Sequence, residues 1–194
     1  MRNRDGVIIQ PARILLFIAI AAVVLSGCIS QQPAGKVILE VAPVIDYYPL
    51  GGFAEKSDGL FTVLKGSISD VKESLNNIVV KKAAQPSTFS ISDELNLVVF
   101  RGVFSTGGYG IKINRVEKQG NEFTVFATYT DPGKGMMVTQ AFTQPTAIIP
   151  VGKLEKGNYK ASLKVTREIE DKEGKKVIEG EKELKSLEFN IELI

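Results

Sequence analysis

The stretch LNLVVFRGVFSTGGYGIKI, residues 95–113, decides the fold class of this chain. Its first part, Leu95–Phe104, is almost continuously apolar, which is typical of a strand that is covered on both faces. Residues 109–113 then alternate between apolar and polar or small side chains, as a strand with one buried face does. Because two-residue hairpin turns need positive φ values, Gly107 and Gly108 predict a hairpin that joins these two strands.

Period-2 alternation of apolar residues recurs along the rest of the chain. It is found at residues 37–41, 123–129, 159–169 and 187–193, with an apolar run at 60–64 and a turn signal at Gly120–Asn121. A helix is favoured only by residues 68–80, where Asp70 as the cap and Glu73 have the spacing of a capping box, with an end at Asn76–Asn77. We therefore expect a mainly β fold, an antiparallel β-sandwich or a partly open barrel, with at most one or two short helices.

The segment LEKGNYKASLKV, residues 154–165, places Tyr159 at the start of a strand. Its spacing resembles the tyrosine corner of Greek-key sandwiches, in which the phenol bonds to the backbone a few residues upstream. The alternative is an ordinary buried tyrosine at the start of a strand.

A highly charged stretch, REIEDKEGKKVIEGEKE, occupies residues 167–183 between the last two predicted strands. Twelve of these 17 residues are charged, too many for two core-facing strands, so we expect a long hairpin whose tip lies in water. Gly174 suits the positive φ of a hairpin bulge. Two interpretations stay open: an arm that grips a partner, or a solvated tip whose charges prevent edge-to-edge aggregation.

The N-terminal residues 1–27 have the pattern of a secretory signal peptide. A basic start is followed by an unbroken apolar run of 12 residues, 14–25, and by small residues that precede Cys28. The alternative is an uncleaved transmembrane helix. Twelve helical residues span only about 18 Å of a hydrocarbon core of about 30 Å, which disfavours this alternative.

The tetrapeptide LSGC, residues 25–28, resembles the lipobox of prokaryotic lipoproteins in all four positions. The resemblance implies cleavage before Cys28 and attachment of a diacylglyceryl group, or of an archaeal ether lipid, to its thiol. Two acyl chains hold a protein on a bilayer, whereas one gives only marginal binding. We therefore expect a signal peptide at 1–27, lipid on Cys28, a tether at 28–35, and a location on the extracytoplasmic face of the cell membrane.

Composition argues against most catalytic and nucleic-acid-binding functions. The chain has no histidine and one cysteine, so it lacks the groups that most nucleophilic mechanisms and zinc or copper sites use. Removal of residues 1–27 takes away three basic residues and one acidic residue, and the formal net charge falls from +2 to zero. Nucleic-acid-binding domains usually carry a basic excess. We expect no catalytic residues, no metal site, no cofactor and no nucleic-acid partner.

A longer resemblance covers residues 95–151. The sequence VVFRGVFSTGGYGIKINRVEKQGNEFTVFATYTDPGKGMMVTQAFTQPTAIIPV contains a hydrophobic strand, a T-G-G-Y turn, two alternating strands, a proline-bearing loop and a T-x-P-like segment. In this order it resembles the C-terminal domain of the PrcB family of protease-complex subunits. The resemblance implies a non-catalytic, mainly β domain that accompanies a surface protease complex. We accordingly expect an N-terminal β-rich segment at 36–94, packed on a PrcB-like domain at 95–194 that ends in the charged hairpin.

The expected function is that of a membrane-anchored lipoprotein that binds another exported protein as an accessory subunit, for example in a protease complex. The residues expected to face this partner are Thr106, Gly107, Gly108 and Tyr109. Two alternatives stay open. One is a lipoprotein that binds a small ligand such as a sugar or peptide, and the other is a protease inhibitor that inserts Thr106–Tyr109 or Asp131–Gly135 into an active site.

Overall fold

We describe the fold from a computed structural model that defines the backbone of residues 36–39 and the whole of residues 59–170 and 172–193. The elements of this part are β1 (Lys36–Leu39), β2 (Leu60–Lys65), α1 (Ile68–Val79), β3 (Thr88–Ser90), β4 (Leu95–Phe100), β5 (Gly110–Gln119), β6 (Glu122–Pro132), β7 (Thr146–Gly152), β8 (Gly157–Glu170) and β9 (Lys176–Glu192). Within it, no helix is long and apolar enough to cross a membrane. The predicted signal peptide and tether, with Cys28, lie outside the described residues.

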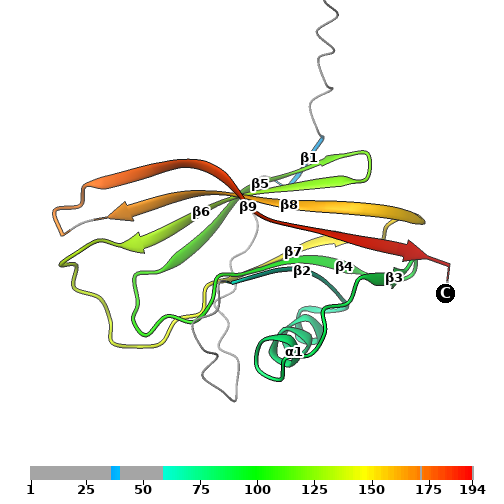
Figure 1. The fold of residues 1–194 in the computed structure, drawn as a ribbon, viewed down its shortest axis with the longest axis horizontal. Helices are drawn as coiled ribbons and strands as arrows, with labels where there is room; N and C mark the ends of the chain where they lie inside the picture. Colours follow the sequence, from blue (N-terminus) through cyan, green and yellow to red (C-terminus); the bar gives the residue numbers. More distant parts are fainter. Residues whose placement is uncertain (1–35, 40–58, 171, 194) are drawn as a thin grey trace, which may run out of the picture. The chain divides into compact units, whose positions relative to one another are not determined.

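The strands form two sheets that face each other (Figure 1). The large sheet has the strand order β1-β5-β6-β8-β9-β3, and the small sheet has the order β2-β4-β7. Helix α1 packs on the small sheet, on the side away from the large sheet (Figure 1). The prediction of a mainly β sandwich with one short helix is therefore confirmed. β2, from the predicted N-terminal segment, pairs with β4, and the predicted boundary at residue 94 stays a prediction.

Two strand pairs are parallel, so the sheets are not purely antiparallel as predicted. β6 pairs with β8, and β3 pairs with β9, in parallel register. Parallel neighbours need a crossover connection. The chain supplies one, because after β6 it passes to the small sheet, forms β7, and returns to place β8 beside β6. Period-2 alternation is the same in parallel and antiparallel strands, so the sequence pattern does not distinguish them.

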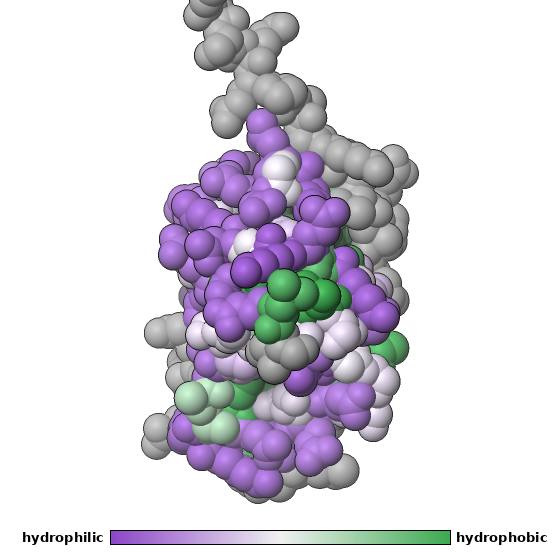
Figure 2. Space-filling model, turned by 90° about the vertical axis from the view of Figure 1, so that its right-hand side faces the viewer, coloured by the Kyte–Doolittle hydropathy of each residue, from purple (hydrophilic) through white to green (hydrophobic). Residues whose placement is uncertain are grey.

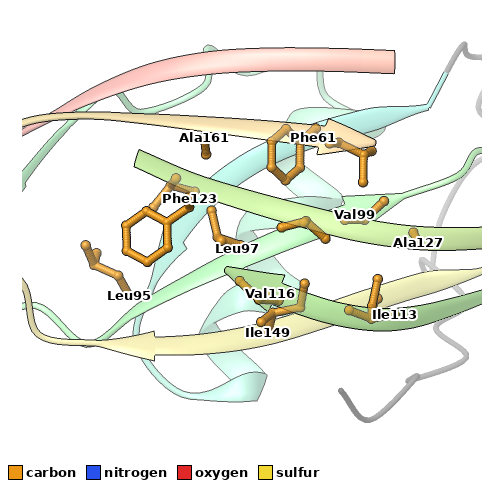
Figure 3. Close-up of a cluster of buried hydrophobic side chains, with 14 of the residues drawn as sticks. Phe61, Leu95, Leu97, Val99, Ile113, Val116, Phe123, Ala127, Ile149 and Ala161 are labelled. Atoms are coloured by element: carbon orange, nitrogen blue, oxygen red, sulfur yellow. The ribbon is translucent and has the colours of Figure 1, made fainter. Parts of the chain in front are cut away.

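β4 is the strand on which both hydrophobic cores depend. All six of its residues are buried. Its odd-numbered residues pack against the large sheet, and Val98 and Phe100 pack against α1. Figure 3 shows the side chains of the core between the two sheets, with Leu95, Leu97 and Val99 of β4 among them. The predicted strand covered on both faces is thus confirmed for β4, although the strand ends at Phe100 rather than at residue 104.

The predicted hairpin after β4 is wrong. β4 belongs to the small sheet and β5 to the large sheet, so Gly107 and Gly108 lie in a crossover between the sheets. The physical reason is that β2 and β7 already pair with the two edges of β4, which leaves no edge for β5. Of the two glycines only Gly108 has a positive φ, +85°. The turns at Gly120 and Gly174 are confirmed, with φ values of +57° and +75° in the β5–β6 and β8–β9 hairpins.

Helix α1 begins earlier than predicted because Ser67, not Asp70, is its N-cap. The Asp70 amide donates to Ser67 Oγ at 3.4 Å, and the Ser67 amide donates to Asp70 Oδ2 at 2.8 Å. These bonds make the capping box, and the hydrogen bonds from Ser67 lower the pKa of Asp70. The helix also continues beyond the predicted end at Asn76–Asn77, since Leu75 and Val79 are buried against the small sheet.

The predicted tyrosine corner is confirmed. The Tyr159 hydroxyl donates to the carbonyl oxygen of Glu155 at 3.0 Å. This bond joins the start of β8 to the preceding loop, and the buried ring of Tyr159 stacks on Phe189 of β9 with a centroid separation of 5.4 Å. The local spacing of residues was therefore enough to predict this hydrogen bond, which is a recurring feature of sandwich folds.

The charged hairpin is exposed, as predicted. Residues 176–184 of β9 are all exposed to solvent. The register of β9 on β8 shifts twice, between Leu163 and Lys164 and between Val165 and Arg167 of β8. Bulges and charges both hinder the pairing of an edge strand with another chain. These features favour the interpretation of a solvated hairpin over that of an arm that grips a partner by strand addition.

Candidate functional site

Two loops form the candidate site. They are the crossover, residues 101–109, and the connection between β6 and β7, residues 133–145. Phe104 and Thr143 exchange two backbone hydrogen bonds of 2.9 Å each, and Thr143 Oγ1 donates to the Thr106 carbonyl at 2.8 Å. We call these two segments the loop pair. Figure 1 shows them beside each other, at the end of the large sheet where β6 ends.

Arg101 joins the loop pair to the large sheet. It follows β4 directly and is buried, with 7% of its surface exposed. Its Nη1 donates to the carbonyl oxygens of Gly110, at 3.0 Å, and Thr130, at 2.6 Å. Its Nη2 forms an ion pair with Asp131. Because Gly110 begins β5 and Asp131 lies near the end of β6, this one side chain connects the crossover to both strands of the β5–β6 hairpin.

Three aromatic rings surround the guanidinium group of Arg101. Its Cζ lies 4.6 Å from the ring centroid of Tyr129, 5.1 Å from that of Phe104 and 5.5 Å from that of Tyr109. Phe104 and Tyr109 also stack on each other, with centroids 3.9 Å apart and 14° between the ring planes. Cation–π attraction is stronger where the cation is desolvated. The cluster therefore stabilises one conformation of the crossover.

The structure places the four residues predicted to bind a partner, Thr106, Gly107, Gly108 and Tyr109, in the crossover. Gly107 is buried, and its amide donates to the Thr139 carbonyl at 2.9 Å. Tyr109 is half-buried because it packs on Phe104, whereas Gly108 is exposed. Tyr109 thus contributes packing within the loop pair. Partner binding by these residues stays a prediction.

The loop pair and the strands that carry it form a continuous stretch of sequence from β4 to β7. The PrcB C-terminal family matches residues 95–151. This confirms the resemblance stated above for less than a third of the chain. The PrcB-matched segment supplies β4 and β7 to the small sheet and β5 and β6 to the large sheet, and it contains the whole loop pair. No curated protein and no solved structure matches the chain significantly.

The PrcB-matched segment also carries an exposed apolar residue that sequence reasoning missed. Met137, in the second loop of the loop pair, is 99% exposed, and Val177 and Ile178 of the charged hairpin are exposed as well. The Gly133 amide donates to the Glu170 carbonyl at 2.6 Å, which places the start of this loop beside the hairpin. Single exposed apolar residues are common on protein surfaces, but an apolar side chain as fully exposed as Met137 is a candidate for contact with a partner. The sequence did offer a signal for this exposed residue: two adjacent methionines, Met136 and Met137, lie in a loop segment rich in glycine and polar residues.

The side of the molecule that carries β3 and the C-terminus is less suited to apolar contacts. Figure 2 shows that this side is mostly hydrophilic, with a hydrophobic patch near the centre of the view and smaller apolar areas towards the right edge and the lower left. An open depression of about 610 Å³ includes Asn121 of the β5–β6 turn, at the other end of β5 from the loop pair, and is lined mainly by polar residues such as Asn158 and Asn190. It contains no residue of the loop pair. We therefore place the candidate site at the loop pair.

The protonation of Tyr129 gives a first prediction about this site. Burial raises the pKa of Tyr129 to about 12, against the opposing effects of Arg101 and Arg167. A tyrosine in the unfolded chain titrates near 10. Between about pH 10 and 12 the folded protein therefore keeps a proton that the unfolded chain loses. The stabilisation is present below about pH 10 and is lost as pH rises towards 12, an effect of about 2–3 kcal/mol.

Urea denaturation of the parent protein and of Tyr129→Phe over this pH range measures the effect. We expect the free energy of unfolding of the parent to fall by about 2–3 kcal/mol more than that of the variant between about pH 9 and 12. Lysine deprotonation is common to both proteins and cancels in the comparison. Parallel curves for the two proteins would show that Tyr129 ionises in the folded state as it does in water.

Proposed function

We propose that this protein is a non-catalytic, lipid-anchored accessory subunit that binds another exported protein through the loop pair, as part of a protease complex like the one that the PrcB namesake accompanies. One observation carries the proposal: Met137, an almost completely exposed apolar side chain, lies in the segment that the PrcB C-terminal family matches. Apolar side chains at the centre of interfaces contribute much of the binding energy, and methionine is enriched there.

The close packing of the loop pair supports the proposal. A Cβ atom added to Gly108 would lie 2.9 Å from Pro132 Cβ and 2.9 Å from Val138 Cγ1. The crossover therefore approaches the second loop so closely that no side chain fits between them at this position. A surface held in its bound conformation before contact loses less conformational entropy on binding. Such a surface suits recognition of a folded partner.

The position of β1 is compatible with partner binding at a membrane. Lys36 of β1 pairs with Lys118, near the end of β5 that leads to Gly120, whereas Gly110 begins β5 beside the loop pair. A strand of ten residues, as β5 is, spans about 33 Å. In this proposal a lipid on Cys28 anchors the chain at the membrane, and β1 joins the large sheet at the end of β5 that is distant from the loop pair.

A pull-down from native membranes in mild detergent, with matched variants, tests the proposal. Met137→Ser removes an exposed apolar side chain from the loop pair. Ile68→Ser removes a half-exposed apolar side chain from α1, which packs on the face of the small sheet that is turned away from the large sheet. We expect one exported protein to co-purify with the parent and with Ile68→Ser, and to fall at least about fivefold with Met137→Ser. Both variants should keep the melting temperature of the parent because neither side chain is buried.

Two results would contradict the proposed function. One is recovery of the protein alone in every sample, and the other is equal co-purification with Met137→Ser. A third variant, Cys28→Ser, separates anchoring from binding. We expect mass spectrometry of the membrane fraction to show that this variant is uncleaved at this site and carries no lipid. A native chain that begins at Met1 with a free thiol would refute the lipid anchor but not the binding of a partner.

A further inference from the structure

The loop pair exposes two large apolar side chains, Met137 and Phe142, and only Met137 contains sulfur. A thioether reacts with peroxides to give a sulfoxide, which is polar and chiral. Met137 is 99% exposed, so its sulfur is open to solvent. A peroxide in the surrounding solution therefore reaches this atom without any movement of the chain.

A tight turn gives the two adjacent methionines different environments. The Met136 amide donates to the Gly133 carbonyl at 3.2 Å and closes a four-residue turn. Its third residue, Gly135, has a φ of +84°, and type II turns require a positive φ at this position. Met136 ends the turn and is half-buried, whereas Met137 follows it and is exposed. We therefore expect the sulfur of Met137 to react faster than that of Met136.

Few other groups in the chain compete for a peroxide. Cysteine and methionine are the sulfur-containing side chains on which peroxides act to form oxygen adducts. The chain has one cysteine and three methionines. Cys28 is the predicted lipid attachment site, and Met1 belongs to the predicted signal peptide. In the proposed mature protein, Met136 and Met137 are thus the only methionines, and both lie in the second loop of the loop pair.

We infer that Met137 is an oxidation site through which peroxides weaken partner binding, an inference that rests on the proposed function. The sulfur lone pair forms a bond to one peroxide oxygen while the O–O bond breaks. The second oxygen takes the proton of the first and leaves as water or an alcohol. The sulfur loses the two electrons that the peroxide gains, so the reaction needs no further co-reactant.

The product changes what the interface has to bury. An interface that encloses the Met137 thioether buries an apolar group, whereas the sulfoxide brings a hydrogen-bond acceptor into the same space. A buried acceptor without a donor costs free energy, so binding should weaken at least about fivefold on oxidation. Methionine sulfoxide reductases return the sulfoxide to the thioether, so the loss should be reversible.

Peptide mapping tests the oxidation itself. The purified full chain in mild detergent is treated with dilute hydrogen peroxide, quenched with catalase and digested with trypsin. The tryptic peptide 135–153 contains both methionines, and tandem mass spectrometry assigns the added oxygen to one of them. We expect Met137 to oxidise at least about threefold faster than Met136. The melting temperature should stay unchanged because the Met137 side chain is not buried.

Pull-downs from untreated native membranes, with the quenched protein as bait, test the effect on binding. Two variants are each compared with their own untreated sample. Met136→Leu keeps the exposed sulfur, so peroxide should lower its recovery of the partner at least about fivefold, as in the parent. Met137→Leu has an apolar side chain that peroxide does not oxidise, so treatment should not change its recovery. Incubation of the treated parent with methionine sulfoxide reductase and dithiothreitol should restore binding.

Three results would overturn the inference while the untreated parent still recovers its partner. They are equal oxidation rates at the two methionines, unchanged recovery after Met137 is fully oxidised, and an equal loss of recovery in Met137→Leu. Each of them leaves the proposed function standing. Failure of the untreated parent to recover any partner would instead contradict the proposed function, and this inference with it.

Discussion

Replacement of Arg101 by methionine is expected to lower the free energy of unfolding by about 3 kcal/mol. Methionine keeps an unbranched apolar stem but has no donor. The variant therefore loses the ion pair with Asp131 and the hydrogen bonds to the carbonyls of Gly110 and Thr130. The Asp131 side chain is only 18% exposed, so its charge stays largely buried with a weaker partner. Chemical denaturation followed by tyrosine fluorescence measures the change.

Arg167→Met is the matched control for this prediction. Arg167 contacts the same carboxylate at 3.5 Å but is 47% exposed. Ion pairs at the surface contribute about 0–1 kcal/mol, so this variant should lose less than about 1 kcal/mol. The double variant Arg101→Met/Asp131→Asn should recover part of the loss because it removes the unpaired charge. Similar losses in the two arginine variants would show that the buried cluster does not stabilise the fold.

Replacement of Gly108 by alanine is expected to cost about 2–5 kcal/mol, from two effects that add. A side chain at a φ of +85° strains the backbone by about 1–2 kcal/mol. The new methyl group would also lie 2.9 Å from atoms of Pro132 and Val138, and overpacking of this kind costs about 1–3 kcal/mol. Thermal denaturation measures the loss of stability. Because the clash lies inside the loop pair, the variant should also bind the proposed partner less tightly.

Two other glycines resolve these effects. Gly120 has a φ of +57° and no atom within 4 Å of an added Cβ, so Gly120→Ala should show the backbone strain alone, about 1 kcal/mol. Gly180 has neither a positive φ nor a neighbour within 4 Å, so Gly180→Ala should change stability by less than about 0.5 kcal/mol. If Gly108→Ala were no worse than Gly120→Ala, the close approach between the two loops would not be present in solution.

Only part of the candidate site could be predicted from the sequence. The segment Thr106–Tyr109 was singled out because its glycines are unusual next to a buried strand, and the structure places it in the loop pair. Arg101 and Met137 were missed. An arginine that follows an apolar strand usually indicates the end of that strand. The burial of Arg101 could not be predicted because it depends on partners up to 30 residues away in the sequence. The exposure of Met137 depends on how the second loop folds over the crossover.

The sequence by itself determined those features that depend on neighbouring residues. Alternation predicted the strands, the apolar run predicted a strand buried on both faces, Gly120 and Gly174 predicted two hairpins, and the spacing around Tyr159 predicted its bond to Glu155. In each case the cause acts within a few residues: the two-residue period of a strand, the φ that a turn needs, or the reach of one phenol ring.

Only the tertiary structure decided how these strands pair. Gly107–Gly108 has the chemistry of a hairpin turn, yet β5 cannot pair with β4 because β2 and β7 occupy both edges of β4. β5 instead joins β6, and β8 returns beside β6 in parallel register. Local patterns state which face of a strand is apolar but not which edge is free, since a free edge depends on strands distant in sequence. The loop pair forms where the chain crosses between the two sheets, and for that reason its position is a property of the whole fold.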